Sequence, residues 1–109
     1  MSVRDLKDSA GAYLKTVCVV YNRDWKNSAR VSCEWHGMQL YKFNQPDDET
    51  ALLAYADSQW PMNSFWVEGG NTTSCTLVTN VNRPKFVKVN EVCNTANFFF
   101  CEYKSKFNL

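Results

Sequence analysis

The sequence has few glycines and prolines, a single histidine, and no long run of charges of one sign. One histidine without a C-x2-C pair offers too few ligands for a four-coordinate zinc site. Four glycines do not form a glycine-rich phosphate-binding loop. Twelve basic residues balance eleven acidic ones, which argues against nucleic acid or an anionic membrane as the partner. No apolar run is long enough for a membrane span.

Aromatic and hydrophobic residues are plentiful. They make up 15% and 45% of the 109 residues, which is typical of a folded globular chain. This length accommodates one domain, so we expect a single domain over residues 1–109, with 1–12 as a flexible lead-in.

Cysteine is also abundant, with five residues in this short chain. That number favours an oxidising, extracellular location. The first eleven residues lack the apolar segment of a signal peptide, so we expect the chain to be a mature secreted form. Asn71-Thr72-Thr73 is a glycosylation sequon, which would make the chain a glycoprotein modified at Asn71. The odd cysteine count leaves one thiol without a partner inside the chain.

The residue pattern predicts an α+β domain with two helices and a mainly antiparallel set of strands. One helix follows Trp25, with Gly37 as its C-terminal cap, and a second begins at Pro46 with acidic residues in its first turn. Short connections between the later strands favour antiparallel pairing. The last strand is apolar on both faces and therefore central. Strands are expected at 16–21, 39–43, 64–67, 76–79, 85–89 and 98–103.

Three segments together resemble the C-type lectin-like domain. Residues 25–40 match its W-x3-A-x3-C-x3-G-x2-L signature, and FWVEG at 65–69 is similar to its F-W-[IV]-G-L core, with Glu68 at the usual glycine. Cys93-x7-Cys101-Glu102 resembles its final cysteine pair and the glutamate that follows. The resemblance covers about residues 16 to 104 and implies that Trp25 and Trp66 are buried in the core.

The resemblance also implies a disulfide pairing, in which Cys33 joins Cys101 and Cys75 joins Cys93. Cys18 is then left over, with three alternatives open. It is a free thiol buried in the first strand, a bridge to another chain in a homo- or heterodimer, or a competitor for one of the two pairs. We favour the buried thiol.

Calcium is the ligand that sugar-binding members of this family use to hold sugar hydroxyls. The resemblance places its oxygen ligands in a long loop and a W-N-D motif, but here segment 68–74 leads directly into Cys75. Asn90-Glu91 is displaced by one residue from the W-N-D position, which would turn each side chain to the opposite face. We therefore expect no calcium-mediated sugar site and no cofactor.

A second, structural calcium site of the family would fall on Asp48 or Glu49 together with Glu102. Two carboxylates alone make an incomplete oxygen shell for calcium. We therefore favour the simpler interpretation, in which Asp48 and Glu49 are charges at a helix start and Glu102 is a solvated strand residue.

The resemblance implies a non-enzymatic recognition module that binds a protein or a glycan on an extracellular surface without the usual calcium site. The alternative is a true lectin with an atypical site on the loop face. Its candidate contacts are Trp60, Asn71, Asn90 and Glu91. Trp35 and Trp60 suit either ligand class, although ordinary packing is the favoured interpretation of both. His36 is expected to be a helix-end imidazole and not a catalytic base.

Overall fold

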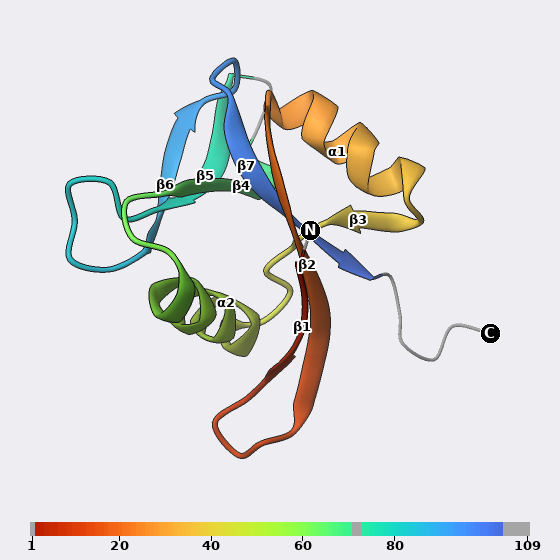
Figure 1. Cartoon of the computed structure of the whole chain (residues 1–109), viewed down its shortest axis with the longest axis vertical. Helices are drawn as coiled ribbons and strands as arrows, with labels where there is room; N and C mark the ends of the chain where they lie inside the picture. The colour runs from red at the N-terminus through yellow and green to blue at the C-terminus, as the bar shows by residue number, and fades with distance from the viewer. Residues whose placement is uncertain (1, 71–72, 104–109) are drawn as a thin grey trace.

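The computed structural model describes residues 2–70 and 73–103, in which two helices flank one sheet (Figure 1). The elements in chain order are β1 (Ser2–Lys7), β2 (Tyr13–Asp24), α1 (Lys26–Trp35), β3 (Met38–Leu40), α2 (Pro46–Gln59), β4 (Ser64–Gly70), β5 (Ser74–Thr79), β6 (Val87–Val92) and β7 (Asn97–Tyr103).

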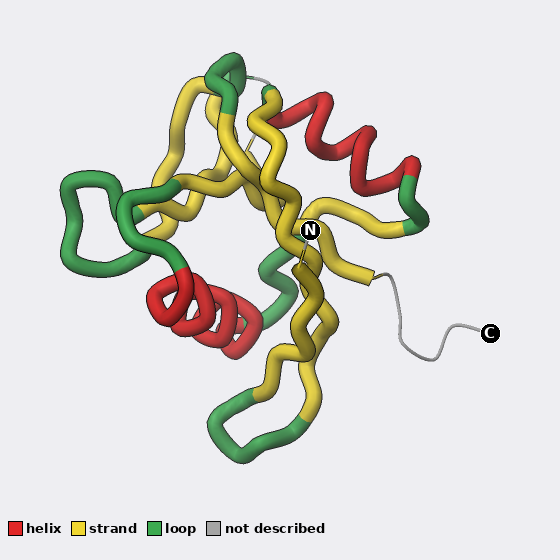
Figure 2. Tube along the Cα trace, in the orientation of Figure 1, coloured by secondary structure: helices red, strands yellow, loops and turns green. Residues whose placement is uncertain are grey.

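The strands form one sheet in the order β1-β2-β7-β4-β5-β6, with β3 added alongside β7 (Figure 2). β7 therefore lies in the interior of the sheet, as its apolar sequence predicts. The prediction of antiparallel pairing is wrong at one place, because β4 runs parallel to β7, with Phe65 opposite Phe98. The connection from β4 to β7 includes β5 and β6, and a connection of that length permits a parallel pair.

The N-terminal segment does not form the flexible lead-in that we expected over residues 1–12. Ser2–Lys7 form the edge strand β1, which pairs antiparallel with β2. Leu6 is buried against the core while its neighbours on the strand remain exposed, so a single apolar anchor was too weak a signal for a strand. Asp8 then accepts hydrogen bonds from the N–H groups of Ala10 and Ala12 and closes the turn.

The two helices pack into two separate apolar clusters, and Figure 1 shows them well apart. Leu52 and Ala56 of α2 join a cluster with Phe65 and Phe100. Ala29 and Cys33 of α1 join the other, with Trp66. α2 begins at Pro46 with three acidic residues in its first turn, as predicted, since proline suits the first helical position and carboxylates suit the positive end of the dipole.

Two disulfides link elements of the domain, and both agree with the expected pairing. Cys33 bonds to Cys101 over 68 residues of sequence, and Cys75 bonds to Cys93 over 18. Cys18 is free and fully buried, and it lies opposite Cys101 in the register of β2 and β7. Burial raises the pKa of the Cys18 thiol. These observations agree with the buried-thiol alternative.

Candidate binding cleft

A cleft of about 600 Å³ lies where the start of α1 meets the end of β4 and the Cys75–Cys93 disulfide. The first turns of α1 contribute one wall of this cleft, and the loop before β7 contributes Asn94. Its volume is in the range of small-molecule sites. The lining residues are Trp25, Lys26, Asn27, Arg30, Glu68, Gly70, Cys75, Cys93 and Asn94.

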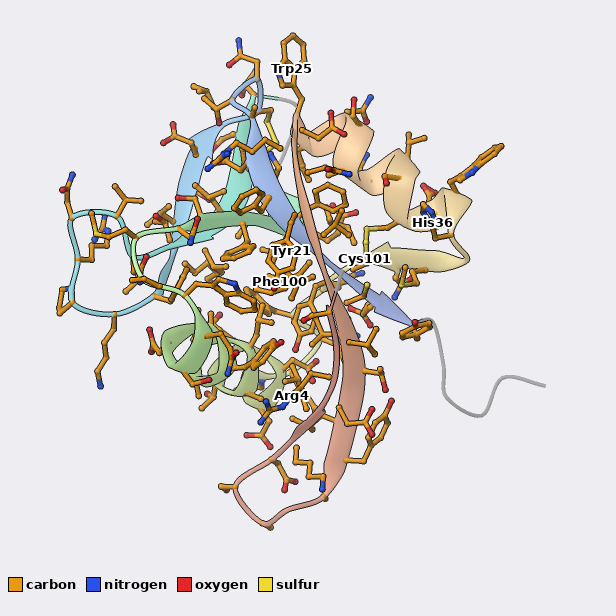
Figure 3. The ribbon with its side chains drawn as sticks, in the orientation of Figure 1. Arg4, Tyr21, Trp25, His36, Phe100 and Cys101 are labelled. Carbon is orange, nitrogen blue, oxygen red and sulfur yellow. A yellow bond between two sulfur atoms is a disulfide. The ribbon has the colours of Figure 1, made fainter. Side chains whose placement is uncertain are left out.

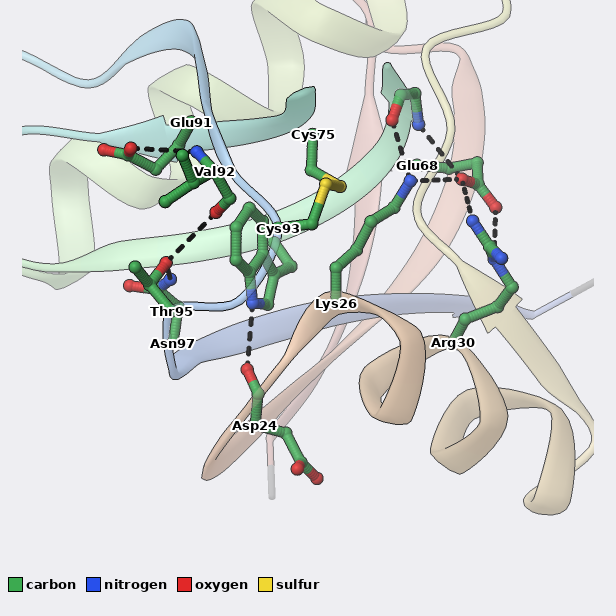
Figure 4. Close-up of a disulfide and its surroundings, with 12 residues drawn as sticks. Asp24, Lys26, Arg30, Glu68, Cys75, Glu91, Val92, Cys93, Thr95 and Asn97 are labelled. Carbon is green, nitrogen blue, oxygen red and sulfur yellow. Dashed lines mark hydrogen bonds and ion pairs between the residues drawn. A yellow bond between two sulfur atoms is a disulfide. The ribbon is translucent and has the colours of Figure 1, made fainter. Parts of the chain in front are cut away.

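Glu68 organises the charges of the cleft (Figure 4). Its carboxylate accepts hydrogen bonds from Arg30 Nε and Nη2, both at 3.1 Å, and lies 3.0 Å from Lys26 Nζ. Lys26 is buried and also donates to the Gly69 carbonyl at 2.7 Å. Because Lys26 and Arg30 are four residues apart on α1, they project from one face of the helix toward the same carboxylate.

These contacts keep Glu68 ionised. Partial burial would raise the pKa of the carboxyl group, but hydrogen bonds from Arg30, Lys26 and the Gly69 N–H outweigh it and lower the pKa to about 2. The cluster therefore carries two positive charges and one negative charge throughout the physiological pH range.

Trp25 is exposed, so the prediction that it is a core residue is wrong. Its side chain is 58% exposed, while Trp66 is fully buried as predicted. Figure 3 shows the Trp25 indole pointing away from the body at the end of β2. The reason lies in the backbone: Trp25 is the extended N-cap residue of α1, so it does not share the buried helical face of Ala29 and Cys33.

A second charged cluster is buried where side chains of β2, α2 and β7 meet. Lys15 Nζ lies 2.9 Å from Glu102 Oε1 and 3.4 Å from Asp48 Oδ2, and all three side chains are at most 10% exposed. Lys15 also donates to the Lys42 carbonyl, and the Lys42 N–H donates to Glu102 at 2.6 Å. Burial of two carboxylates is tolerated because a cation lies between them.

This cluster corrects the expectation that Glu102 is a solvated strand residue, whereas Asp48 lies in the first turn of α2 as expected. Both are buried and converge on the Lys15 ammonium. Glu49 does not join them and pairs instead with Lys88 at 2.8 Å. In residues 2–70 and 73–103, no group of three or more His, Cys, Asp or Glu side chains is placed to hold a metal ion. The expectation that calcium is not required stays a prediction.

Comparison of the sequence with protein-family models and with curated proteins finds no match. Comparison of the structure does find matches among solved structures. EMS16, a snake venom C-type lectin-like protein and an antagonist of the collagen receptor integrin α2β1, superposes with a TM-score of 0.64. The match covers 83% of this chain and 91% of that one at 13% sequence identity. This chain has the C-type lectin-like fold.

Within the C-type lectin-like fold, three of the atypical lectin contacts named from the sequence are described, and none of the three lines the cleft. Trp60 is half-buried and packs against Tyr55, Phe65 and Phe100. Asn90 and Glu91 lie exposed on the edge strand β6 and do not line the cleft.

Two other residues named from the sequence have different outcomes. Asn71, with its sequon, lies outside the described residues. His36 is exposed at the end of α1, with Nδ1 2.9 Å from the Ser32 carbonyl oxygen, as its sequence position predicts.

Sequence reasoning missed the charged cluster of the cleft. Its one visible signal was Glu68 at the position where the family usually has glycine, a departure that has no local explanation. Lys26 and Arg30 fall at i and i+4 after Trp25, but nothing in the sequence links this helix to Glu68 some forty residues later.

No described helix is both long and apolar enough to cross a membrane.

Proposed function

We propose that this chain is a secreted, non-enzymatic recognition domain that binds an extracellular ligand without calcium, through the cleft beside Trp25. The observation that carries the proposal is the exposed Trp25 side chain next to a cation pair already fixed in place by Glu68. An exposed indole held on a rigid element is a common anchor of binding sites. The Cys75–Cys93 disulfide holds the opposite wall.

Two further observations support this proposal. Lys15 already compensates the two buried carboxylates that a structural calcium would use. The structural neighbour EMS16 is a binding protein directed at a protein receptor. Recognition of a protein or a glycan by this chain is therefore consistent with both its fold and its cleft.

A second candidate surface lies on the outer side of α1. Val31 and Trp35 are four residues apart and are 58% and 84% exposed. Spacing of i and i+4 places them on one helical face, and exposed aromatic and aliphatic side chains together are typical of protein interfaces. This face favours a protein partner that does not enter the cleft.

Two matched variants separate these sites. Trp25→Ala and Trp35→Ala each remove one exposed indole, so both should fold with the stability of the wild type. Binding of the labelled chain to animal cell surfaces would be measured by flow cytometry, with calcium and with EDTA.

We expect binding that survives EDTA and falls at least tenfold in Trp25→Ala only. Loss of binding in Trp35→Ala alone would show that the ligand binds the outer face of α1 and not the cleft. Loss in EDTA would contradict the calcium-free proposal.

A further inference from the structure

We propose that the cleft beside Trp25 binds a sugar that carries a carboxylate group, such as a sialic or uronic acid. This proposal rests on the recognition function proposed above and names the chemistry of the ligand. The cleft offers three features that such a ligand uses together. They are a cationic side chain with a hydrogen-bond donor not used within the described residues, an aromatic face, and exposed amide side chains.

The cationic donor is Arg30. Its Nε and Nη2 atoms bond to Glu68, and its Nη1 has no partner among residues 2–70 and 73–103. The Arg30 side chain is 40% exposed, and Arg30 lines the cleft. Because Glu68 already holds the guanidinium plane, a ligand carboxylate would bind Arg30 with little further loss of side-chain entropy. Lys26, by contrast, is buried and directs its ammonium at Gly69 and Glu68.

The charge of the lining fits a ligand with a single negative charge. Lys26 and Arg30 contribute two positive charges and Glu68 removes one, which leaves a net charge of +1 among the lining residues. A phosphate group carries more charge and is typically held by several free donors. One free guanidinium nitrogen matches a carboxylate better.

The aromatic face and the amides favour a sugar. Trp25 presents its indole at the rim, and none of the aromatic pairs found in the described part of the chain includes it. The C–H face of a pyranose ring can pack on such an apolar surface. Asn27 and Asn94 also line the cleft and are exposed, and each amide offers donors and an acceptor to hydroxyl groups. The cleft volume of about 600 Å³ accommodates one or two sugar rings.

The test uses 3′-sialyllactose, glucuronic acid and neutral lactose as probes, in EDTA. Binding would be measured by isothermal titration calorimetry in every variant. Where Trp25 is present, it would also be followed by NMR of the Trp25 indole N–H, assigned from its disappearance in Trp25→Phe. We expect a saturable shift with one or both acids, at least tenfold weaker binding of lactose, and weakening of the acid complex as salt is raised. The two acids distinguish a sialic acid from a uronic acid.

Four variants complete the experiment. Arg30→Gln and Trp25→Ala should each weaken acid binding at least tenfold, whereas Trp35→Ala and Lys88→Gln, an exposed aromatic and an exposed cation elsewhere, should bind like the wild type. Circular dichroism and thermal melts would confirm that Arg30→Gln is folded. If Arg30→Gln is unfolded, Arg30→Lys would be tested in its place. Arg30→Lys keeps the positive charge but lacks the planar guanidinium donors, so we again expect weaker binding.

Equal binding of lactose, absence of acid binding, or acid binding that survives both cleft variants would overturn the proposal. If the cells are still bound through Trp25 while no sugar acid binds, the recognition function stands and the ligand of the cleft is a protein.

Discussion

At the scale of single residues, the domain contains two clusters of charged side chains, one in the interior and one at the cleft. Lys15 compensates Asp48 and Glu102 in the interior, and Glu68 gathers Lys26 and Arg30 at the cleft. The interior cluster is not fully satisfied, because Asp48 Oδ1 is buried and accepts no hydrogen bond from the described residues. A buried carboxylate such as Asp48 lowers the stability of the fold once its ion-pair partner is removed.

Replacing Lys15 by methionine keeps an unbranched side chain that is one atom shorter and removes its charge. Two buried carboxylates then lack a counter-charge, and we expect Lys15→Met to lower the free energy of unfolding by about 3–5 kcal/mol. Urea denaturation at neutral pH would measure the loss. Lys88→Met is the matched control, since the Lys88–Glu49 pair is solvent-exposed and its loss should cost less than about 1 kcal/mol. Equal losses in the two variants would contradict the compensating role of Lys15.

Glu68 should make the stability of the domain sensitive to acid. Its pKa falls from 4.5 to about 2 on folding, so the unfolded chain binds the proton more readily than the folded one. Stability contributed by Glu68 is therefore fully present above about pH 4.5 and lost as the pH falls toward 2. After allowance for its partial exposure, we expect this contribution to be about 1–2 kcal/mol.

The measurement is the free energy of unfolding across this acid range in the wild type and in Glu68→Gln. The variant should show the flatter profile, and Glu49→Gln, which removes a partly exposed carboxylate, should keep the steeper one. A Glu68→Gln profile parallel to that of the wild type would rule out the contribution.

At the scale of elements, two glycines end their elements for different reasons. Gly37 follows α1 with a φ of +75°, and a Cβ there would meet nothing within 4 Å. Gly70 ends β4 with a φ of +83°, and a Cβ there would lie 2.1 Å from the Ser74 carbonyl oxygen. Gly37 therefore supplies a left-handed backbone, whereas Gly70 also permits two backbone segments to approach closely.

Alanine variants separate the two effects. Gly37→Ala should lower the free energy of unfolding by about 1–2 kcal/mol, the cost of a left-handed alanine. Gly70→Ala adds a backbone overlap and should cost about 2–4 kcal/mol. Thermal or urea unfolding of the two variants provides the comparison. A smaller loss in Gly70→Ala than in Gly37→Ala would mean that the turn after β4 relaxes freely.

At the scale of the whole molecule, covalent links complement a modest core. Cys33–Cys101 ties α1 to the inner strand β7, and Cys75–Cys93 ties β5 to the segment that follows β6. A domain of this length buries a limited apolar area, so each link contributes a noticeable part of the stability.

The two disulfides should contribute unequally. In the chain-entropy description, closing 68 residues contributes about 4 kcal/mol and closing 18 residues about 3 kcal/mol. Cys33→Ala/Cys101→Ala should therefore lose more stability in urea, without reductant, than Cys75→Ala/Cys93→Ala. The reverse order would show that contacts around the cleft, and not loop length, set the contribution of these links.

Much of the architecture follows from local features of the sequence. Pro46 with its acidic neighbours specifies the start of α2, and the apolar run at 98–103 specifies an inner strand, because proline geometry, the helix dipole and burial on both faces act within a few residues. The spacing of the cysteines and tryptophans was also enough to indicate the C-type lectin-like fold. The strand at Ser2–Lys7 escaped prediction because one buried residue, Leu6, carries its apolar signal.

The candidate site depended on contacts between distant segments. Trp25 matches a signature position, yet it is exposed because it is the extended N-cap residue that precedes α1. Lys15 and Glu102 are 87 residues apart, and nothing near either residue indicates the other. The electrostatic environment of a side chain is set by neighbours in space, so the sequence specified the elements and the disulfide frame, whereas the packing of those elements determined which charges are paired and which indole is free to bind.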